Sequence, residues 1–85
     1  MDFVYAKVAT RQFEKLDKDT QKQIKSYTNA LETLENPRTK GKALSGNLAS
    51  FWRYRVGKYR LICDIQDEKL VILCLSIDKR DKIYK

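Results

Sequence analysis

The chain has 85 residues, with 18 Lys and Arg, 11 Asp and Glu, two Cys and no His, so its formal net charge is +7 at pH 7. Its length predicts one domain spanning residues 1–85, and the lack of His excludes Ser–His or Cys–His catalysis and an ordinary zinc site. The N-terminus has no signal-peptide pattern and no apolar run reaches the roughly 18 residues of a membrane span, so we expect a cytoplasmic protein without a membrane partner.

The first part of the chain predicts a strand followed by two helices. Residues 3–8 read as a short strand of mixed polarity, and Thr10 then caps a short helix. Asp19 or Thr20 begins a longer helix, and Thr20 has capping-box spacing with Gln23. Apolar residues recur along this helix at steps of three and four. They indicate one stripe buried in the core, formed by Ile24, Tyr27, Leu31 and Leu34.

The middle of the chain predicts a long loop. Asn36-Pro37 ends the second helix, because the residue before a proline disfavours the helical conformation. Residues 38–50 contain glycines and small polar residues between two expected anchors, Leu44 and Leu48. The loop is long for a connection in so small a domain, which indicates a functional role.

The stretch 51–60 predicts a β-hairpin. Aromatic or aliphatic residues alternate with arginines on both sides of a glycine. Gly57-Lys58 is the expected two-residue turn, with Gly at the first central position as in a type II′ turn. This turn places Arg55 directly opposite Arg60 on the neighbouring strand.

The two faces of this hairpin differ in chemistry. The apolar face predicts the core side of the sheet and carries Tyr54, Val56, Tyr59, Leu61 and Cys63. The other face gathers Arg53, Arg55 and Arg60. Like charges directly opposite destabilise a sheet, so the arginines indicate an anion site, with an ordinary solvent-exposed strand face as the alternative. Between residues 38 and 60 there are seven Lys and Arg and no Asp or Glu, which favours nucleic acid or an acidic protein segment as a partner.

The last strand completes the predicted fold. Residues 70–77 are nearly all apolar, as is typical of a central strand covered on both faces, and a charged tail follows. Cys63 and Cys74 lie in apolar strand patterns, so we expect buried free thiols. The predicted class is α+β, with two N-terminal helices on one face of a four-stranded, mainly antiparallel sheet. The first strand is expected beside the last.

Four motifs follow one another along the chain: Glu35-Asn36-Pro37-Arg38, Gly41-Lys42-Ala43-Leu44-Ser45-Gly46, Trp52-Arg53-Tyr54-Arg55-Val56-Gly57-Lys58-Tyr59-Arg60 and Ile77-Asp78-Lys79-Arg80-Asp81-Lys82-Ile83-Tyr84. In this order they resemble the RelE/ParE superfamily of bacterial toxins, specifically its RelE-like mRNA interferases of type II toxin–antitoxin systems. The resemblance covers essentially the whole chain. It implies the RelE-like β-α-α-β-β-β fold and a toxin that inhibits translation by cutting mRNA in the ribosomal A site, without a metal or another cofactor. In that reaction the 2′-hydroxyl of one nucleotide attacks the adjacent phosphate.

The resemblance also implies roles for individual residues. The expected catalytic residues are Arg60, Arg80, Tyr84 and Arg55. Arg60 would stabilise the phosphorane, Arg80 would protonate or stabilise the leaving 5′ oxygen, and Tyr84 would orient or stack on a base. The best-known members carry lysines where this chain has Arg53 and Arg55. Arginine keeps its proton, which favours phosphate binding over a general-base role at these two positions. The expected RNA-binding residues are Arg53, Lys58, Lys42, Lys40, Lys79 and Lys82.

Several alternatives stay open at this point. The base that takes the 2′-hydroxyl proton would be Tyr84, Lys79, Lys82 or a ribosomal group. Asp78 replaces the usual glycine of the tail, where it would either position Arg80 or weaken anion binding. Trp52 is expected in the core rather than as a base-stacking platform.

The resemblance implies three partners: a cognate RelB-like antitoxin, the ribosome with its A-site mRNA, and operator DNA reached only through the antitoxin. Two other functions remain compatible with the sequence. One is a ParE-like gyrase inhibitor. The other is a catalytically silent toxin homologue that binds an antitoxin without cutting RNA.

Overall fold

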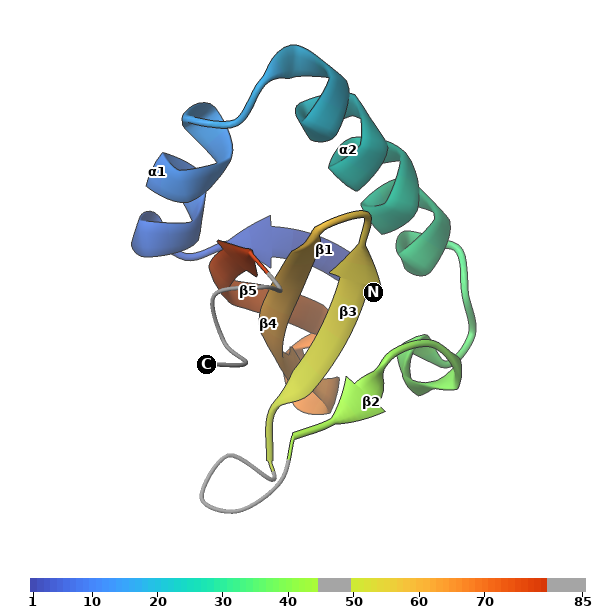
Figure 1. The fold of residues 1–85 in the computed structure, drawn as a ribbon. Helices are drawn as coiled ribbons and strands as arrows, with labels where there is room; N and C mark the ends of the chain where they lie inside the picture. Colours follow the sequence, from blue (N-terminus) through green and yellow to red (C-terminus); the bar gives the residue numbers. More distant parts are fainter. Residues whose placement is uncertain (45–49, 80–85) are drawn as a thin grey trace.

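The computed structural model describes residues 1–44 and 50–79, and in it both helices lie over the same side of one mixed sheet (Figure 1). The strand order across the sheet is β1-β5-β4-β3-β2. The class predicted from the sequence, α+β with two helices on one sheet, is confirmed. In chain order the elements are β1 (Asp2–Tyr5), α1 (Lys7–Glu14), α2 (Lys18–Glu32), the 3₁₀ turn η1 (Pro37–Thr39), β2 (Lys42–Ala43), β3 (Trp52–Val56), β4 (Tyr59–Gln66), the 3₁₀ turn η3 (Asp67–Lys69) and β5 (Val71–Lys79).

Within the described residues the sheet has five strands, where the sequence predicts four. As expected, β5 lies centrally, parallel to β1 on one side and antiparallel to β4 on the other. The additional strand is β2, which pairs antiparallel with β3 inside the stretch predicted as a loop. Only the pairs Lys42–Arg53 and Ala43–Trp52 form it, and the Leu44 N–H donates to the Phe51 carbonyl just beyond. Two residues are too few to show a period-two pattern, so the strand has no sequence signature.

The ends of the helices also differ from the prediction. The first strand ends at Tyr5, and α1 begins directly after an extended Ala6, whose carbonyl accepts the Thr10 N–H. Thr10 therefore lies inside α1, where its hydroxyl donates to the same carbonyl. Helix α2 begins after Asp17 rather than at Asp19 or Thr20, and the Thr20 hydroxyl donates back to the Asp17 carboxylate. In both helices the N-cap is an earlier residue, Ala6 or Asp17, which has an extended backbone and whose carbonyl accepts the first hydrogen bond of the helix. Residue propensities alone do not locate the first residue of a helix this closely.

The second helix ends before its predicted stop. It ends at Glu32, and Thr33 is its C-cap, with a hydroxyl that donates to the Ala30 carbonyl. Pro37 begins η1 instead of terminating α2. The residues between α2 and β2 cross from the end of the helix to the edge of the sheet (Figure 1).

The core lies between the helices and the apolar sheet face, as the hairpin pattern predicts. Ile24 and Leu31 from α2 and Ala9 from α1 are fully or almost fully buried against the sheet. The expected core residues of the hairpin are buried as well, apart from Tyr59, which is half-buried. Cys63 on β4 and Cys74 on β5 are cross-strand partners, and both are buried free thiols, as predicted. The sheet side of this core consists of Tyr54, Val56, Leu61, Cys63, Ile65, Ile72, Cys74 and Ile77.

The hairpin itself matches the prediction in register and turn type. Val56 pairs with Tyr59, and Arg55 pairs with Arg60. Gly57 has φ 57°, whereas Lys58 is not among the described residues with positive φ. A type II′ turn needs positive φ at its first central residue only, which is the pattern observed.

Candidate nucleic-acid interface

A row of cations crosses the edge of the sheet on the face opposite the core. Lys42 on β2 pairs with Arg53 on β3, and Arg55 on β3 pairs with Arg60 on β4. Paired residues point to the same face of a sheet, and residues two apart on a strand do so as well. The structure therefore brings together Arg53, Arg55 and Arg60, as predicted, and it adds Lys42 to them.

Arg60 differs from its neighbours because it is buried. Only 8% of its surface is exposed, whereas Arg55 and Lys42 are exposed and Arg53 is half-buried. The sequence predicts the face that Arg60 occupies but not its burial. A guanidinium screened from water acts more strongly on a nearby anion, since the effective dielectric constant around it is lower.

Asp78 lies on the other side of Arg60 in the sheet. The two residues pair across β4 and β5, and the half-buried Asp78 accepts a hydrogen bond from the Ser76 hydroxyl at 3.4 Å. The sequence places Asp78 near the tail arginine, and the register shows that it lies beside Arg60. The row therefore runs from an exposed cation on β3 to a buried cation on β4 and then to a carboxylate on β5.

A groove runs along the edge of β3 next to this row. It has a volume of about 220 Å³ and is lined by Tyr27, Gly41, Lys42, Arg53 and Arg55. Sequence reasoning assigns Tyr27 to the buried stripe of the helix and misses its place in the groove. The only available signal was its hydroxyl, which distinguishes it from the aliphatic residues of that stripe.

Tyr27 is held in place from two sides. Its ring meets the Tyr54 ring edge to face, with centroids 6.0 Å apart and planes at 61°, and the Lys40 Nζ lies 5.7 Å from its centroid. The ordinary pKa of a tyrosine phenol already lies well above neutral, and burial raises the pKa of Tyr27 further, so its phenol is protonated at neutral pH. The group is therefore a hydrogen-bond donor at the wall of a cationic groove.

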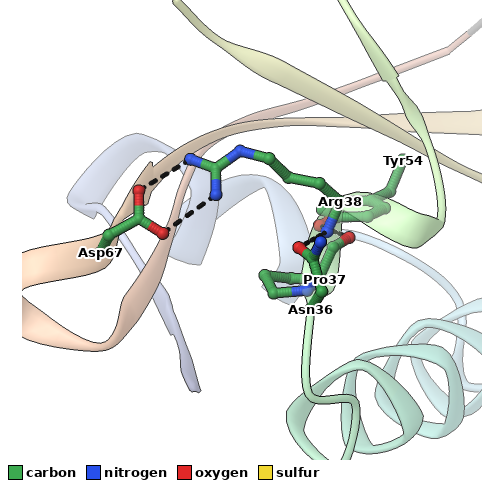
Figure 2. A network of polar contacts seen from close by, with 5 residues as sticks. All are labelled: Asn36, Pro37, Arg38, Tyr54 and Asp67. Carbon is green, nitrogen blue, oxygen red and sulfur yellow. Dashed lines mark hydrogen bonds and ion pairs between the residues drawn. The ribbon is translucent and has the colours of Figure 1, made fainter.

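The segment before β2 is fixed by side-chain hydrogen bonds rather than by regular structure (Figure 2). The Asn36 side-chain oxygen accepts the Arg38 N–H at 3.0 Å, and the buried Tyr54 hydroxyl donates to the Pro37 carbonyl at 2.7 Å. Arg38 forms a two-pronged ion pair with Asp67 at 2.9 Å for each contact, which ties η1 to the turn between β4 and β5. We call residues 36–41 the clamp segment.

The clamp segment ends in a close contact with β3. The Trp52 indole N–H donates to the Lys40 carbonyl at 2.7 Å, so this half-buried side chain packs on the core, as expected, and also fixes the backbone. Gly41 has φ 77°, and a Cβ at this position would lie 2.4 Å from the Arg53 carbonyl oxygen. Only glycine fits there. The clamp segment therefore leads into β2, where Lys42 lies beside Arg53, and it holds Lys40 near the Tyr27 ring.

Two other expected RNA-binding residues lie elsewhere. Lys58 and Lys79 line a separate hollow of about 460 Å³ at the hairpin turn, together with residues of the first turns of α2. Both lysines are exposed. They are close to one another but do not border the groove beside β3.

The remaining expected site residues, Arg80, Lys82 and Tyr84, lie outside the described residues, so their roles stay predictions. In the part of the chain that is described, no three His, Cys, Asp or Glu side chains come together in a possible metal site. No helix within residues 1–44 and 50–79 is both long and apolar enough to cross a bilayer.

Comparison with known proteins places the chain in a family. Residues 3–84 match the model of the ParE toxin of the type II toxin–antitoxin system parDE. A curated relative, the mRNA interferase toxin RelE of Escherichia coli K12, is 31% identical over 75 residues, which cover 87% of this chain and 77% of that protein.

Solved structures agree with this assignment. The toxin–antitoxin complex RelBE2 of Mycobacterium tuberculosis contains a chain with a TM-score of 0.81 and 28% identity, covering 93% of this chain and 90% of that one. The isolated E. coli RelE toxin shares the fold, with a TM-score of 0.74 at 19% identity over 92% of this chain and 82% of that one. The chain therefore belongs to the RelE/ParE superfamily of toxins of type II toxin–antitoxin systems.

Proposed function

We propose that this toxin is a ribosome-dependent, metal-independent endoribonuclease that cuts mRNA in the A site and thereby inhibits translation. The observation that carries the proposal is the direct pairing of exposed Arg55 with buried Arg60, on the sheet face opposite the core. Such a pair suits a phosphate that gains negative charge during reaction. The curated relative described as an mRNA interferase, at 31% identity, supports the same reaction class.

The proposed reaction is an internal attack. The 2′-oxygen of one nucleotide forms a bond to the adjacent phosphorus, and the bond from phosphorus to the 5′ oxygen of the next nucleotide breaks. A base takes the 2′-hydroxyl proton, and the leaving oxygen gains a proton. The products are a 2′,3′-cyclic phosphate and a 5′-hydroxyl, as the family resemblance implies.

Arg60 is the proposed stabiliser of the phosphorane. Its burial keeps water from screening its charge, and its position on a central strand fixes its place before substrate binds. Arg55 binds the same phosphate from the neighbouring strand. Arginine does not serve as a general base in proteins, so a different group takes the 2′-hydroxyl proton. Arg80 and Tyr84 keep the roles given to them by resemblance.

In this proposal the ribosome positions the substrate. An mRNA held in the A site meets the toxin in a fixed orientation, which lowers the entropic part of the activation barrier for cleavage. The free protein is then a poor nuclease on naked RNA. A RelB-like antitoxin would cover the toxin, and relatives solved as RelB–RelE complexes support such a partner. Operator DNA would be contacted through the antitoxin.

Primer extension on a defined mRNA with purified ribosomes and a filled P site tests the proposal. New 5′ ends within the A-site codon are expected with the protein, and none when ribosomes are omitted. Arg60→Lys keeps a buried cation but not the guanidinium geometry, and we expect cleavage to fall about 10²-fold. Lys69→Ala, an exposed cation on η3, is the matched control and should cut normally. Equal cleavage by both variants would contradict the role of Arg60.

Gyrase inhibition is the second candidate, because the matching family model is described as a ParE toxin. A supercoiling assay with the purified protein separates the two functions. Blocked supercoiling with intact mRNA would favour the gyrase inhibitor. A protein inactive in both assays that still binds a RelB-like antitoxin would be the silent homologue.

A further inference from the structure

The groove beside β3 gathers positive charge in addition to the Arg55–Arg60 pair proposed for the cutting step. Lys42, Arg53 and Arg55 line it, and none of the three makes an ion pair with a residue in the ranges 1–44 and 50–79. Lys42 and Arg53 are direct cross-strand partners, so their Cβ atoms are about 5 Å apart. Like charges directly opposite one another on neighbouring strands destabilise the pair, and an anion bound between them offsets this repulsion.

Tyr27 provides a neutral donor at the same place. Its hydroxyl has no hydrogen-bond partner among the described residues, although its ring is held by Tyr54 and by the Lys40 ammonium. A tyrosine phenol is protonated at neutral pH, so the Tyr27 hydroxyl can donate to an oxygen of a bound anion. Two cations and one neutral donor around a groove of about 220 Å³ are complementary to a phosphate group.

The groove is formed before any ligand binds. Gly41 lies against the Arg53 backbone, and the Trp52 indole holds the Lys40 carbonyl, so the clamp segment sets the distance between Lys42 and the arginine row. A site that is already arranged loses less entropy when it captures a ligand.

We propose that this groove is a second phosphate subsite for single-stranded RNA, next to the phosphate that is cut. Lys42 and Arg53 bind the neighbouring phosphodiester, and the Tyr27 hydroxyl donates to it. Arg53 and Arg55 are two residues apart on one face, about 6.6–6.8 Å along the strand, which suits consecutive phosphates of an extended chain. That the ligand is RNA rests on the proposed nuclease function. That the groove binds a phosphate group rests on the residues that line it.

Fluorescence anisotropy of a short fluorescein-labelled single-stranded RNA with the free protein tests the subsite without ribosomes or cleavage. Lys42→Ala is expected to weaken binding several-fold and to lower the slope of log affinity against log salt by about 0.7, the value for one phosphate contact on a single strand. Lys69→Ala removes the same charge from η3 and should leave that slope unchanged.

The hydroxyl is tested separately. Tyr27→Phe keeps the ring against Tyr54 and should weaken RNA binding about fivefold, the effect of one lost hydrogen bond. Tyr5→Phe is the matched control, because the Tyr5 ring packs against Phe3 and Phe13 away from the groove, and it should bind RNA normally. Thermal unfolding of each variant confirms that the comparison is between folded proteins.

Two results would overturn the subsite. One is an equal salt slope for Lys42→Ala and Lys69→Ala. The other is a Lys42→Ala/Arg53→Ala double variant that loses polyglutamate binding as strongly as RNA binding, because the groove would then respond to charge alone. If the unmodified protein cut no mRNA on ribosomes while Lys42→Ala still lowered RNA affinity and salt slope, the nuclease proposal would fail and the subsite would stand.

Discussion

The hairpin β3–β4 and the clamp segment (residues 36–41) lie side by side at one edge of the sheet, yet they are determined in different ways. The hairpin is fixed by its turn and by alternating side chains, which set both register and faces. The clamp segment has only one short 3₁₀ turn. It is fixed by hydrogen bonds that Tyr54 and Trp52 on β3 donate to its carbonyls and by the ion pair of Arg38 with Asp67 on η3. A local pattern therefore specifies the first region, and distant side chains specify the second.

The largest expected effect comes from the contact that joins the two regions. Gly41→Ala places a Cβ 2.4 Å from the Arg53 carbonyl oxygen at φ 77°, and should lower the free energy of unfolding by about 2–3 kcal/mol. Gly57→Ala is the control within the hairpin, because a Cβ there meets only the end of the Gln23 side chain at 3.5 Å. We expect about 1–2 kcal/mol from its positive φ. Urea unfolding measures both, and equal losses would show that the close contact has no special importance.

A buried hydrogen bond should give the next largest effect. Tyr54→Phe leaves the Pro37 carbonyl without its donor and should cost about 1–2 kcal/mol of stability. The matched change Tyr27→Phe removes a hydroxyl that has no partner in the described part of the chain, so it should change stability by less than about 0.5 kcal/mol. If thermal unfolding gave the same loss for both, the Tyr54 bond would not hold the clamp segment.

The smallest expected effect is that of the exposed ion pair. The hydrogen bond from Arg38 lowers the pKa of the Asp67 carboxyl below its ordinary value. This pair therefore stabilises the fold above the unfolded pKa of Asp, near pH 4, and its contribution is lost as the pH falls through the lower folded value. Because both side chains are exposed, solvent screens the pair and the change is small.

The comparison of Asp67→Asn with the unmodified protein measures this pair. Urea unfolding of both proteins at pH 7 and at pH 2.5 should show a stability difference at the higher pH that shrinks at the lower one. A difference of the same size at both pH values would mean that the Arg38–Asp67 charge interaction does not contribute.

The same contrast explains what could be predicted from the sequence. Alternation and the Gly57 turn were sufficient to predict the pairing of Arg55 with Arg60 and the apolar face of the hairpin. The apolar run of residues 70–77 predicted that β5 lies inside the sheet rather than at its edge. The strand β2 was not predictable, since it depends on Gly41 fitting against β3 and not on any pattern of its own. The family motif around Asn36-Pro37-Arg38 was recognised, but its role as a clamp is visible only when Tyr54 and Asp67 are seen beside it (Figure 2).

The site was predicted to a similar extent. The arginine row follows from strand periodicity, whereas the burial of Arg60 and the nearness of Asp78 depend on how three strands lie together. Tyr27 was assigned to the core because helical periodicity cannot distinguish the centre of a buried stripe from its edge. The structure places it at that edge, where it lines the groove.

The chemistry of the cut ends gives the most direct test of the proposed function. Ribosomes programmed with a defined mRNA and a filled P site are incubated with the protein, and mass spectrometry identifies the new ends. The nuclease proposal predicts a 2′,3′-cyclic phosphate on the upstream fragment and a 5′-hydroxyl on the downstream fragment, both within the A-site codon. Intact mRNA, or a 3′-hydroxyl with a 5′-phosphate, would contradict internal attack by the 2′-hydroxyl on a phosphate held by Arg55 and Arg60.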